Sequence, residues 1–267
     1  RERVRRALNA LGYFAAQVTV TVEGKPAEDL EAQDAVSAEP PRRAIKTEIR
    51  ITRGRLFRLR NLDLQGVPAD ITDGLSRKKL KLEEGAPARS PEIVAANAHI
   101  VEVLREKGYP LAAIAKRTTT ADHAGAALDI LIQVAPGPKA TMGNVTISGT
   151  EKVHGDFIAG LAPFSPGDAF QDSLLKDFRE EIERLNVFDA VTLEEAKELD
   201  AEGRMSLTVN VHERPRHLIG VAAGWSTFDG AALSTYWEHR NLYREAERLR
   251  IEAAASRLLL NATDDYE

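Results

Sequence analysis

Apolar residues recur along this chain with two periodicities, one that predicts strands and one that predicts helices. Between 205 and 213 they occupy every second position, as in a half-buried strand, with Leu207, Val209 and Val211 alternating with Thr208, Asn210 and His212. Around position 100 the spacing is three or four residues, which predicts an amphipathic helix with an inner face of Ile93, Ala96, Ile100, Val103 and Leu104.

Landmarks of these stretches return at a nearly constant interval. Glycines that follow predicted strands or precede similar segments are 83, 83 and 82 residues apart, in the pairs Gly66 and Gly149, Gly54 and Gly137, and Gly85 and Gly167. The segments that end the longer helices also recur, as Leu11-Gly12-Tyr13-Phe14, Lys107-Gly108-Tyr109-Pro110 and Leu185-Asn186-Val187-Phe188. A fixed period of this length indicates a tandem array of small modules.

Each module reads as strand, short helix, longer helix, strand, strand. The predicted elements of one module are a strand at 59–66, helices at about 70–80 and from Ser90 to Gly108, and strands at 111–119 and 127–135. Those of the next are a strand at 142–149, helices at about 152–161 and 174–185, and strands at 190–198 and 205–213. Ser90 is the expected N-cap of the longer helix, with Pro91 in its first turn. The fold class is α+β, with helices on one face of each sheet.

The organisation along the chain follows from these units. We expect a partial module at 1–54, whole modules at 55–137 and 138–215, and a different region at 216–267. The first module lacks its opening strand and first helix, which suggests a chain cut at its start; its strands are expected at 17–22 and 45–52. An acidic, proline-containing insertion at 23–44 is expected to be a disordered hairpin loop or a partner-binding loop.

After Pro215 the helical periodicity ends, and three segments follow in which apolar and polar or small residues alternate. They span 218–226, 231–239 and 248–257, with an Asp-Gly turn signal at Asp229-Gly230. In the first, Ile219, Val221, Ala223 and Trp225 face one side. Segments of about ten residues with aromatic residues such as Trp225 and Trp237 are typical of a transmembrane β-barrel, although a soluble antiparallel sheet gives the same alternation. Three strands alone would leave unpaired edges in lipid, so such a barrel would be incomplete here.

The composition and the motifs of the chain argue against several classes of function. The net charge is −5, from 36 basic and 41 acidic residues, which argues against nucleic-acid binding. The absence of cysteine excludes disulfides, thiolate metal sites and thiol catalysis. The six histidines lack metal-ligand spacing, and no hydrolase, phosphate-loop or dinucleotide motif occurs. We expect no catalytic residue, no cofactor and no metal, and read Glu180, Glu181 and Glu183 as a solvated helix face.

Repeated strand-helix-helix-strand-strand units whose longer helix ends in a pair such as Gly108-Tyr109 resemble POTRA domains. The segments 220–230 and 237–249 resemble the first hairpin of barrels of the Omp85 superfamily, where the second commonly reads Trp-x-His-Arg-Asn-Leu-Phe-Gly-Arg-Gly-Glu. Here Tyr243 replaces the phenylalanine, and Arg244 and Ala246 stand at the glycine positions. Three modules before the barrel favour the TamA branch over BamA.

The resemblance implies an assembly or translocation factor that is not an enzyme. Its barrel would lie in the outer membrane, in contact with lipid, and its POTRA modules in the periplasm of a Gram-negative-type cell. Partners would be unfolded outer-membrane or autotransporter-type clients and, in the TamA branch, an inner-membrane-anchored TamB-like protein. A two-partner-type secretion transporter and a periplasmic scaffold without insertase activity remain alternatives.

Two surfaces are predicted to bind clients. The first is an exposed strand edge that accepts an extended chain, at 111–119 (Leu111, Ile114) and 190–198 (Val191, Leu193). Charges at Glu194, Glu195, Lys197 and Glu198 would limit uncontrolled pairing on the second edge or simply be solvated. The other surface is the barrel seam, which the resemblance places on the first barrel strand with Gly220, Val221, Gly224 and Trp225. Its glycines would ease strand opening or only relieve crowding.

Overall fold

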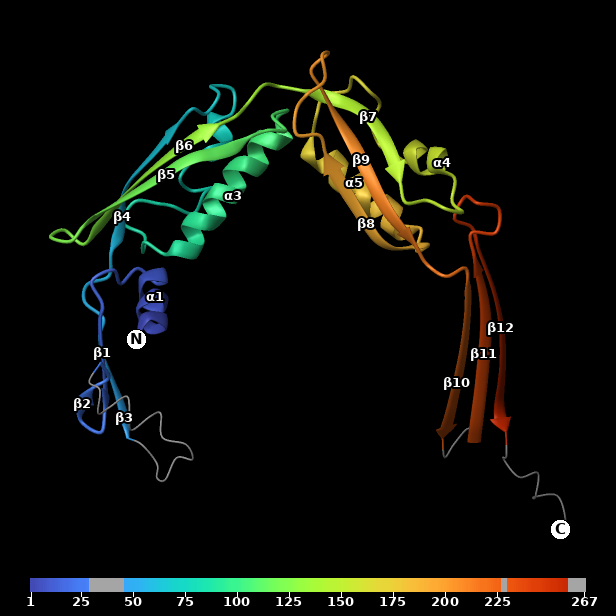
Figure 1. Cartoon of the computed structure of the whole chain (residues 1–267), viewed down its shortest axis with the longest axis horizontal. Coiled ribbons are helices and arrows are strands. Elements are labelled where there is room, and N and C mark those ends of the chain that lie inside the picture. Colours follow the sequence, from blue (N-terminus) through green and yellow to red (C-terminus); the bar gives the residue numbers. More distant parts are fainter. Residues whose placement is uncertain (29–45, 227–229, 259–267) are drawn as a thin grey trace, which may run out of the picture. The chain divides into compact units, whose positions relative to one another are not determined.

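Two modules with the same topology form the centre of the chain. The structure, a computed structural model, describes residues 1–28, 46–226 and 230–258, and divides into the units Arg1–Pro138 and Lys139–Glu267. In the first unit one module contains β4 (Arg58–Gln65), the 3₁₀ helix η1 (Thr72–Leu75), α3 (Ser90–Glu106), β5 (Ala113–Asp122) and β6 (Ala127–Ala135). The sheet order is β4-β6-β5, with β6 parallel to β4 and antiparallel to β5 (Figure 1).

The second unit repeats this arrangement. Its module contains β7 (Thr141–Ser148), α4 (Gly155–Gly160), α5 (Asp172–Arg184), β8 (Phe188–Glu195) and β9 (Arg204–Glu213). The order β7-β9-β8 again places the last strand in the centre, parallel to β7 and antiparallel to β8 (Figure 1). The sequence therefore predicted the mixed α+β class and the order of strands and longer helices correctly.

The core of each module lies between its central strand and its longer helix. On β6 every second side chain is buried (Leu128, Ile130, Ile132 and Val134), and on β9 the same holds for Met205, Leu207, Val209 and Val211. The helices contribute Ile93, Ala96, Ile100 and Leu104 from α3, and Leu175, Phe178 and Ile182 from α5. In each module the buried side chains of the central strand and those of the longer helix thus form one apolar layer.

The recurring glycines share a backbone conformation. All six have a positive φ: 71° and 69° at Gly54 and Gly137, 79° and 84° at Gly66 and Gly149, and 78° and 99° at Gly85 and Gly167. Residues with a side chain rarely adopt this region, so the constant glycine interval reflects the same turns repeated in two modules. The three predicted helix ends also have a residue of positive φ, Gly12, Gly108 and Asn186.

Three local predictions were wrong. In place of the helix at 70–80 there is only the short η1, because Pro68 precedes it and Gly74, a poor helix former, lies inside it. Ser90 is the first residue of α3 rather than its N-cap, which is Arg89. The spacing at 174–185 predicts an inner face of Leu174, Phe178, Ile182 and Leu185, but in α5 the buried leucine is Leu175 and Leu174 is only half-buried.

In its described residues, 1–28 and 46–54, the first module has one helix, α1 (Glu2–Ala10), and the strands β1 (Gln17–Val22), β2 (Lys25–Pro26) and β3 (Thr47–Thr52) in the order β2-β1-β3. β1 and β3 pair antiparallel from Gln17↔Thr52 to Val22↔Thr47, as the sequence predicted within two residues. Most of the insertion at 23–44 lies outside the described residues, so its predicted character stays untested.

The last sheet is open and antiparallel. It consists of β10 (His217–Ser226), β11 (Gly230–Arg240) and β12 (Arg248–Leu258), in the order β10-β11-β12. The register runs from His217↔His239 to Ser226↔Gly230 in the first pair and continues through Trp237↔Ile251 in the second. Residues 227–229 of the predicted Asp-Gly turn lie outside the described part of the chain.

Candidate functional site

In each of the two complete modules, the strand that follows the longer helix lies at an edge of the sheet. β5 and β8 are terminal strands of their sheets, as are β4 and β7 on the opposite side. On β8 the side chains of Val191, Leu193 and Glu195 are half-buried and alternate with exposed neighbours, which places these three on the side of the sheet that carries α5. Among the described residues no strand pairs with the outer edge of β8, and the strand has a defined inner face.

The backbone of β8 alternates in its pairing. The amide of Ala196 donates to the carbonyl oxygen of Ser206 at 3.0 Å, and the register continues as Glu194↔Thr208 and Thr192↔Asn210. In an antiparallel ladder alternate residues face the partner strand, so the peptide groups of Val191 and Leu193 point to the outer edge. This edge can receive another extended chain without disturbing the pairing with β9.

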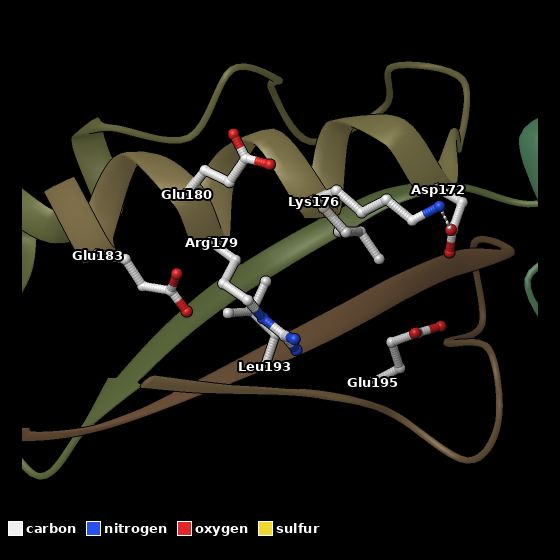
Figure 2. Close-up of a pocket in the computed structure, with 8 residues that line it drawn as sticks. Asp172, Lys176, Arg179, Glu180, Glu183, Leu193 and Glu195 are labelled. Atoms are coloured by element: carbon white, nitrogen blue, oxygen red, sulfur yellow. Dashed lines mark ion pairs between the residues drawn. The ribbon is translucent and has the colours of Figure 1, made fainter. Parts of the chain in front are cut away.

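A groove runs along this edge between β8 and α5. It has a volume of about 520 Å³ and is lined by Leu193 and Glu195 of the strand and by Asp172, Leu175, Lys176, Arg179, Glu180 and Glu183 of the helix. Figure 2 shows the Arg179 side chain extending from α5 toward Leu193. An apolar floor with charged walls suits an extended peptide whose alternate side chains point inward.

The exposed face of the last sheet is apolar. Ile219, Val221 and Trp225 are 70%, 70% and 67% exposed, and Leu233, Leu249 and Ile251 are also exposed. The strand register brings these side chains onto one face that carries no Asp, Glu, Lys or Arg between Ile219 and Trp225 or at their cross-strand partners. A continuous uncharged face of this kind marks a contact with lipid or with another protein.

The opposite face of the same sheet is polar. Glu238 is 2% exposed, and its carboxylate forms ion pairs with Arg240 at 2.8 Å and with Arg248 at 3.3 Å. Arg250 lies over the Tyr236 ring at 3.9 Å from its centroid. The sheet therefore has one uncharged apolar face and one face whose charged side chains are paired.

Comparison with known proteins identifies the module fold. Residues 140–214 match the family model POTRA, described as a surface antigen variable number repeat. The structure of BamA from Haemophilus ducreyi lacking POTRA domains 1–3 superposes with a TM-score of 0.63 and 13% identity, over 75% of this chain and 37% of that chain. The modules have the POTRA fold. POTRA domains 3–5 of BamA from Haemophilus influenzae give a TM-score of 0.57 and 18% identity, over 79% of this chain and 78% of theirs.

A curated relative extends this likeness to the sequence. The chain is 24% identical over 191 residues to the outer membrane protein assembly factor BamA of Neorickettsia risticii (strain Illinois). The match covers 72% of this chain and 25% of the relative. The chain thus spans about a quarter of the length of the curated relative that it matches.

Hydrogen bonds connect the last POTRA module to the turn between β11 and β12. The amide of His154 donates to the Arg244 carbonyl oxygen at 2.9 Å, and Nε of Arg244 donates to the carbonyl oxygen of Lys152 at 3.0 Å. Arg244 and Ala246 have φ of 76° and 64°, in the region that favours glycine, and these are the positions at which the Omp85 hairpin pattern has glycine. Here Arg244 accepts a strained backbone while its side chain reaches the module.

A single carboxylate stabilises the same module loop. The Glu213 carboxylate at the end of β9 accepts hydrogen bonds from the amides of Glu151, Lys152 and Val153 at 2.8–2.9 Å. Partial burial alone would raise the pKa of Glu213, but the three amide donors outweigh it and the pKa is lowered. The loop at 151–153 is therefore fixed from both sides, by Glu213 and by Arg244.

The sequence-predicted site residues divide into three groups. Ile114, Val191 and Leu193 lie on the edge strands β5 and β8, and Gly220, Val221, Gly224 and Trp225 lie on β10, itself an edge strand. Leu111 is not part of β5: it lies in a turn in which the Ala112 amide bonds to the Tyr109 carbonyl oxygen. Lys197 and Glu198 likewise lie beyond the end of β8, so of the four predicted charges only Glu194 and Glu195 lie on this strand.

The helix side of the groove was missed from the sequence. Leu175, Arg179 and Glu183 lie four residues apart on α5, so they form one row along the helix that faces the β8 side. That spacing was available as a signal, but nothing in the sequence places this row beside a free strand edge.

Within residues 1–28, 46–226 and 230–258, no three metal-binding side chains come together. Over the same residues, no helix combines the length and apolar character needed to cross a membrane.

Proposed function

We propose that this chain is part of an outer-membrane assembly factor of the Omp85 superfamily. The observation that supports this most is the combination of POTRA modules with a directly following sheet whose exposed face is uncharged and apolar. The similarity to a protein named as an outer membrane protein assembly factor points the same way. In this proposal the modules lie in the periplasm, where they receive unfolded outer-membrane clients, and β10–β12 lie in the outer membrane.

The proposal gives the two faces of β10–β12 different surroundings. Ile219 to Trp225 span about 20 Å at roughly 3.4 Å per residue, close to the apolar band of about 25 Å of outer-membrane barrels. The apolar face would contact lipid, and the face with Glu238 would contact a polar interior. Because unpaired backbone groups are costly in lipid, the outer edges of β10 and β12 need pairing strands there. The edge of β10, with Gly220 and Gly224, would be the seam.

Client capture would occur by β-augmentation on β8. The outward peptide groups near Val191 and Leu193 supply backbone hydrogen bonds, and the groove beside α5 takes alternate client side chains. The edge of β5, with Ile114, offers a second position of the same kind. Clients with alternating apolar and polar residues fit this geometry, as outer-membrane strands do.

A pair of variants tests capture at β8. Leu193→Pro removes an outward amide hydrogen without removing a bond to β9, whereas Leu193→Ala shortens the side chain and keeps the amide. A fluorescent nine-residue peptide of alternating valine and threonine is titrated against the 267-residue chain in mild detergent, and anisotropy is measured. We expect Leu193→Pro to weaken binding at least about tenfold, since several strand hydrogen bonds depend on this edge, and Leu193→Ala to change it by less than about threefold. Equal binding by wild type and Leu193→Pro would refute capture at β8.

The finer assignment stays a proposal. The TamA branch with a TamB-like partner rests on the number of modules, whereas the relatives compared above are BamA proteins. Co-purification of the protein from cross-linked cells separates the cases, since only the TamA branch predicts an inner-membrane-anchored partner. If the protein is instead a two-partner-type transporter, deleting its gene should abolish the secretion of a single exoprotein.

A further inference from the structure

We propose that the groove between α5 and β8 selects its extended ligand by charge, taking an acidic side chain over Arg179 and a basic one, two positions later, over Glu183. This inference rests on the β-augmentation proposed for β8 and names the class of segment that the edge prefers. Both residues are exposed and line the groove, and Figure 2 shows them on successive turns of α5.

The spacing of the two charges matches an extended strand. Arg179 and Glu183 are four residues apart, which is about 6 Å along a helix axis at 1.5 Å per residue. Side chains on one face of a strand repeat every two residues, or about 7 Å. A strand laid along β8 therefore places consecutive inward side chains close to Arg179 and Glu183 in turn.

The other charges of the helix wall are already engaged. Lys176 pairs with Asp172 at 3.1 Å, and Glu180 pairs with Arg184 at 3.3 Å. Within the part of the chain that the structure describes, Arg179 and Glu183 have no ion-pair partner, and they do not pair with each other. A ligand thus meets one available cation and one available anion, in a fixed order.

The chain direction sets that order. Three residues connect the end of α5 to the start of β8, so Glu183 lies toward the beginning of β8, and Asp172 and Glu195 lie toward its end (Figure 2). A strand added antiparallel to β8, the more stable pairing, reaches Arg179 before Glu183. The preferred segment therefore reads acidic-x-basic from N- to C-terminus, with both charged side chains facing the groove.

Three peptides test this reading. They share an alternating valine-threonine frame and carry Glu-x-Lys, Lys-x-Glu or Gln-x-Gln at the central inward positions. Anisotropy titrations use the 267-residue chain in mild detergent, as wild type, with Arg179→Glu plus Glu183→Arg, and with Arg179→Gln plus Glu183→Gln. We expect wild type to bind Glu-x-Lys about fivefold more tightly than Lys-x-Glu, because two exposed ion pairs replace two repulsions.

The variants decide the interpretation. The charge-swapped variant is expected to prefer Lys-x-Glu, the neutral variant to bind both charged peptides alike, and wild type to lose its preference in 0.5 M salt, which screens exposed pairs. The inference about charge is overturned if wild type binds the two charged peptides equally, or if the charge-swapped variant keeps the wild-type preference. If Gln-x-Gln still binds in that case, β-augmentation on β8 stands. Loss of binding of all three peptides overturns both.

Discussion

Gly149 lies so close to Val211 that no side chain fits between them. A Cβ atom on Gly149 would be 2.1 Å from the Val211 carbonyl oxygen, and in the preceding module a Cβ on Gly66 would be 2.2 Å from that of Val134. In both modules the end of the opening strand thus passes against the backbone of the central strand. This contact explains why glycine recurs at positions 66 and 149.

Gly149→Ala is expected to destabilise the module strongly. The variant would combine a positive φ of 84° with a collision against backbone, so we expect a loss of about 3 kcal/mol in the free energy of unfolding. The control is Gly203→Ala, with a φ of 75° and nothing within 4 Å of the added Cβ, for which about 1 kcal/mol is expected. Urea unfolding followed by circular dichroism measures both. Equal losses would show that the contact with Val211 is unimportant.

Glu213 is expected to make the module sensitive to acid. Its pKa is lowered in the folded state, so its stabilising contribution is complete above its ordinary pKa of 4.5 and disappears as the pH falls through the lower folded value. Glu213→Gln keeps an acceptor but loses the charge, and should cost about 1 kcal/mol at pH 7. The difference from wild type should shrink as the pH falls below 4.5.

The control for that experiment is Glu194→Gln, an exposed carboxylate on β8. It should unfold like wild type at pH 7, in urea titrations repeated from pH 7 to pH 3. A difference between Glu213→Gln and wild type that stays constant over this range would contradict the role of the charge.

Gly220 makes room for the Tyr236 ring. A Cβ atom at Gly220 would lie 2.1 Å from the ring, whereas one at Gly224 would meet nothing within 4 Å. Gly220→Ala should therefore lower insertion activity and the stability of the sheet, and Tyr236→Ala in the same chain should restore part of the stability. Heat-modified mobility in electrophoresis and client assembly in membranes are the readouts. If Gly224→Ala is as harmful as Gly220→Ala, crowding is not the reason for the glycine.

The strands and the two long helices could be predicted because local pattern and tertiary burial agree there. Leu207, Val209 and Val211 alternate because β9 is central and one face of it is buried, and Ile93 to Leu104 follow the period of a helix on a sheet. Predictions failed where a few residues outweigh the pattern, as at Gly74 in η1 and at Leu111 in a turn after Pro110.

The groove could not be predicted because it depends on pairing between distant segments. Arg179 and Glu183 look like an ordinary solvated helix face until the sheet order places β8, and not β9, at the edge beside α5. The same limit applies to Glu213, whose partners are 60–62 residues away along the chain. Sequence pattern identifies which face is apolar, but only the fold shows which edge remains free.

Contact between lipid and the apolar face of β10–β12 is tested most directly by tryptophan fluorescence. The only two tryptophans of this chain, Trp225 and Trp237, both lie on that face. The protein purified from membranes, with any tryptophan elsewhere replaced by phenylalanine, is reconstituted in vesicles with and without brominated acyl chains. Strong quenching by the brominated lipid, with little quenching by aqueous acrylamide, is the predicted result. Efficient quenching by acrylamide and none by the brominated lipid would contradict the account.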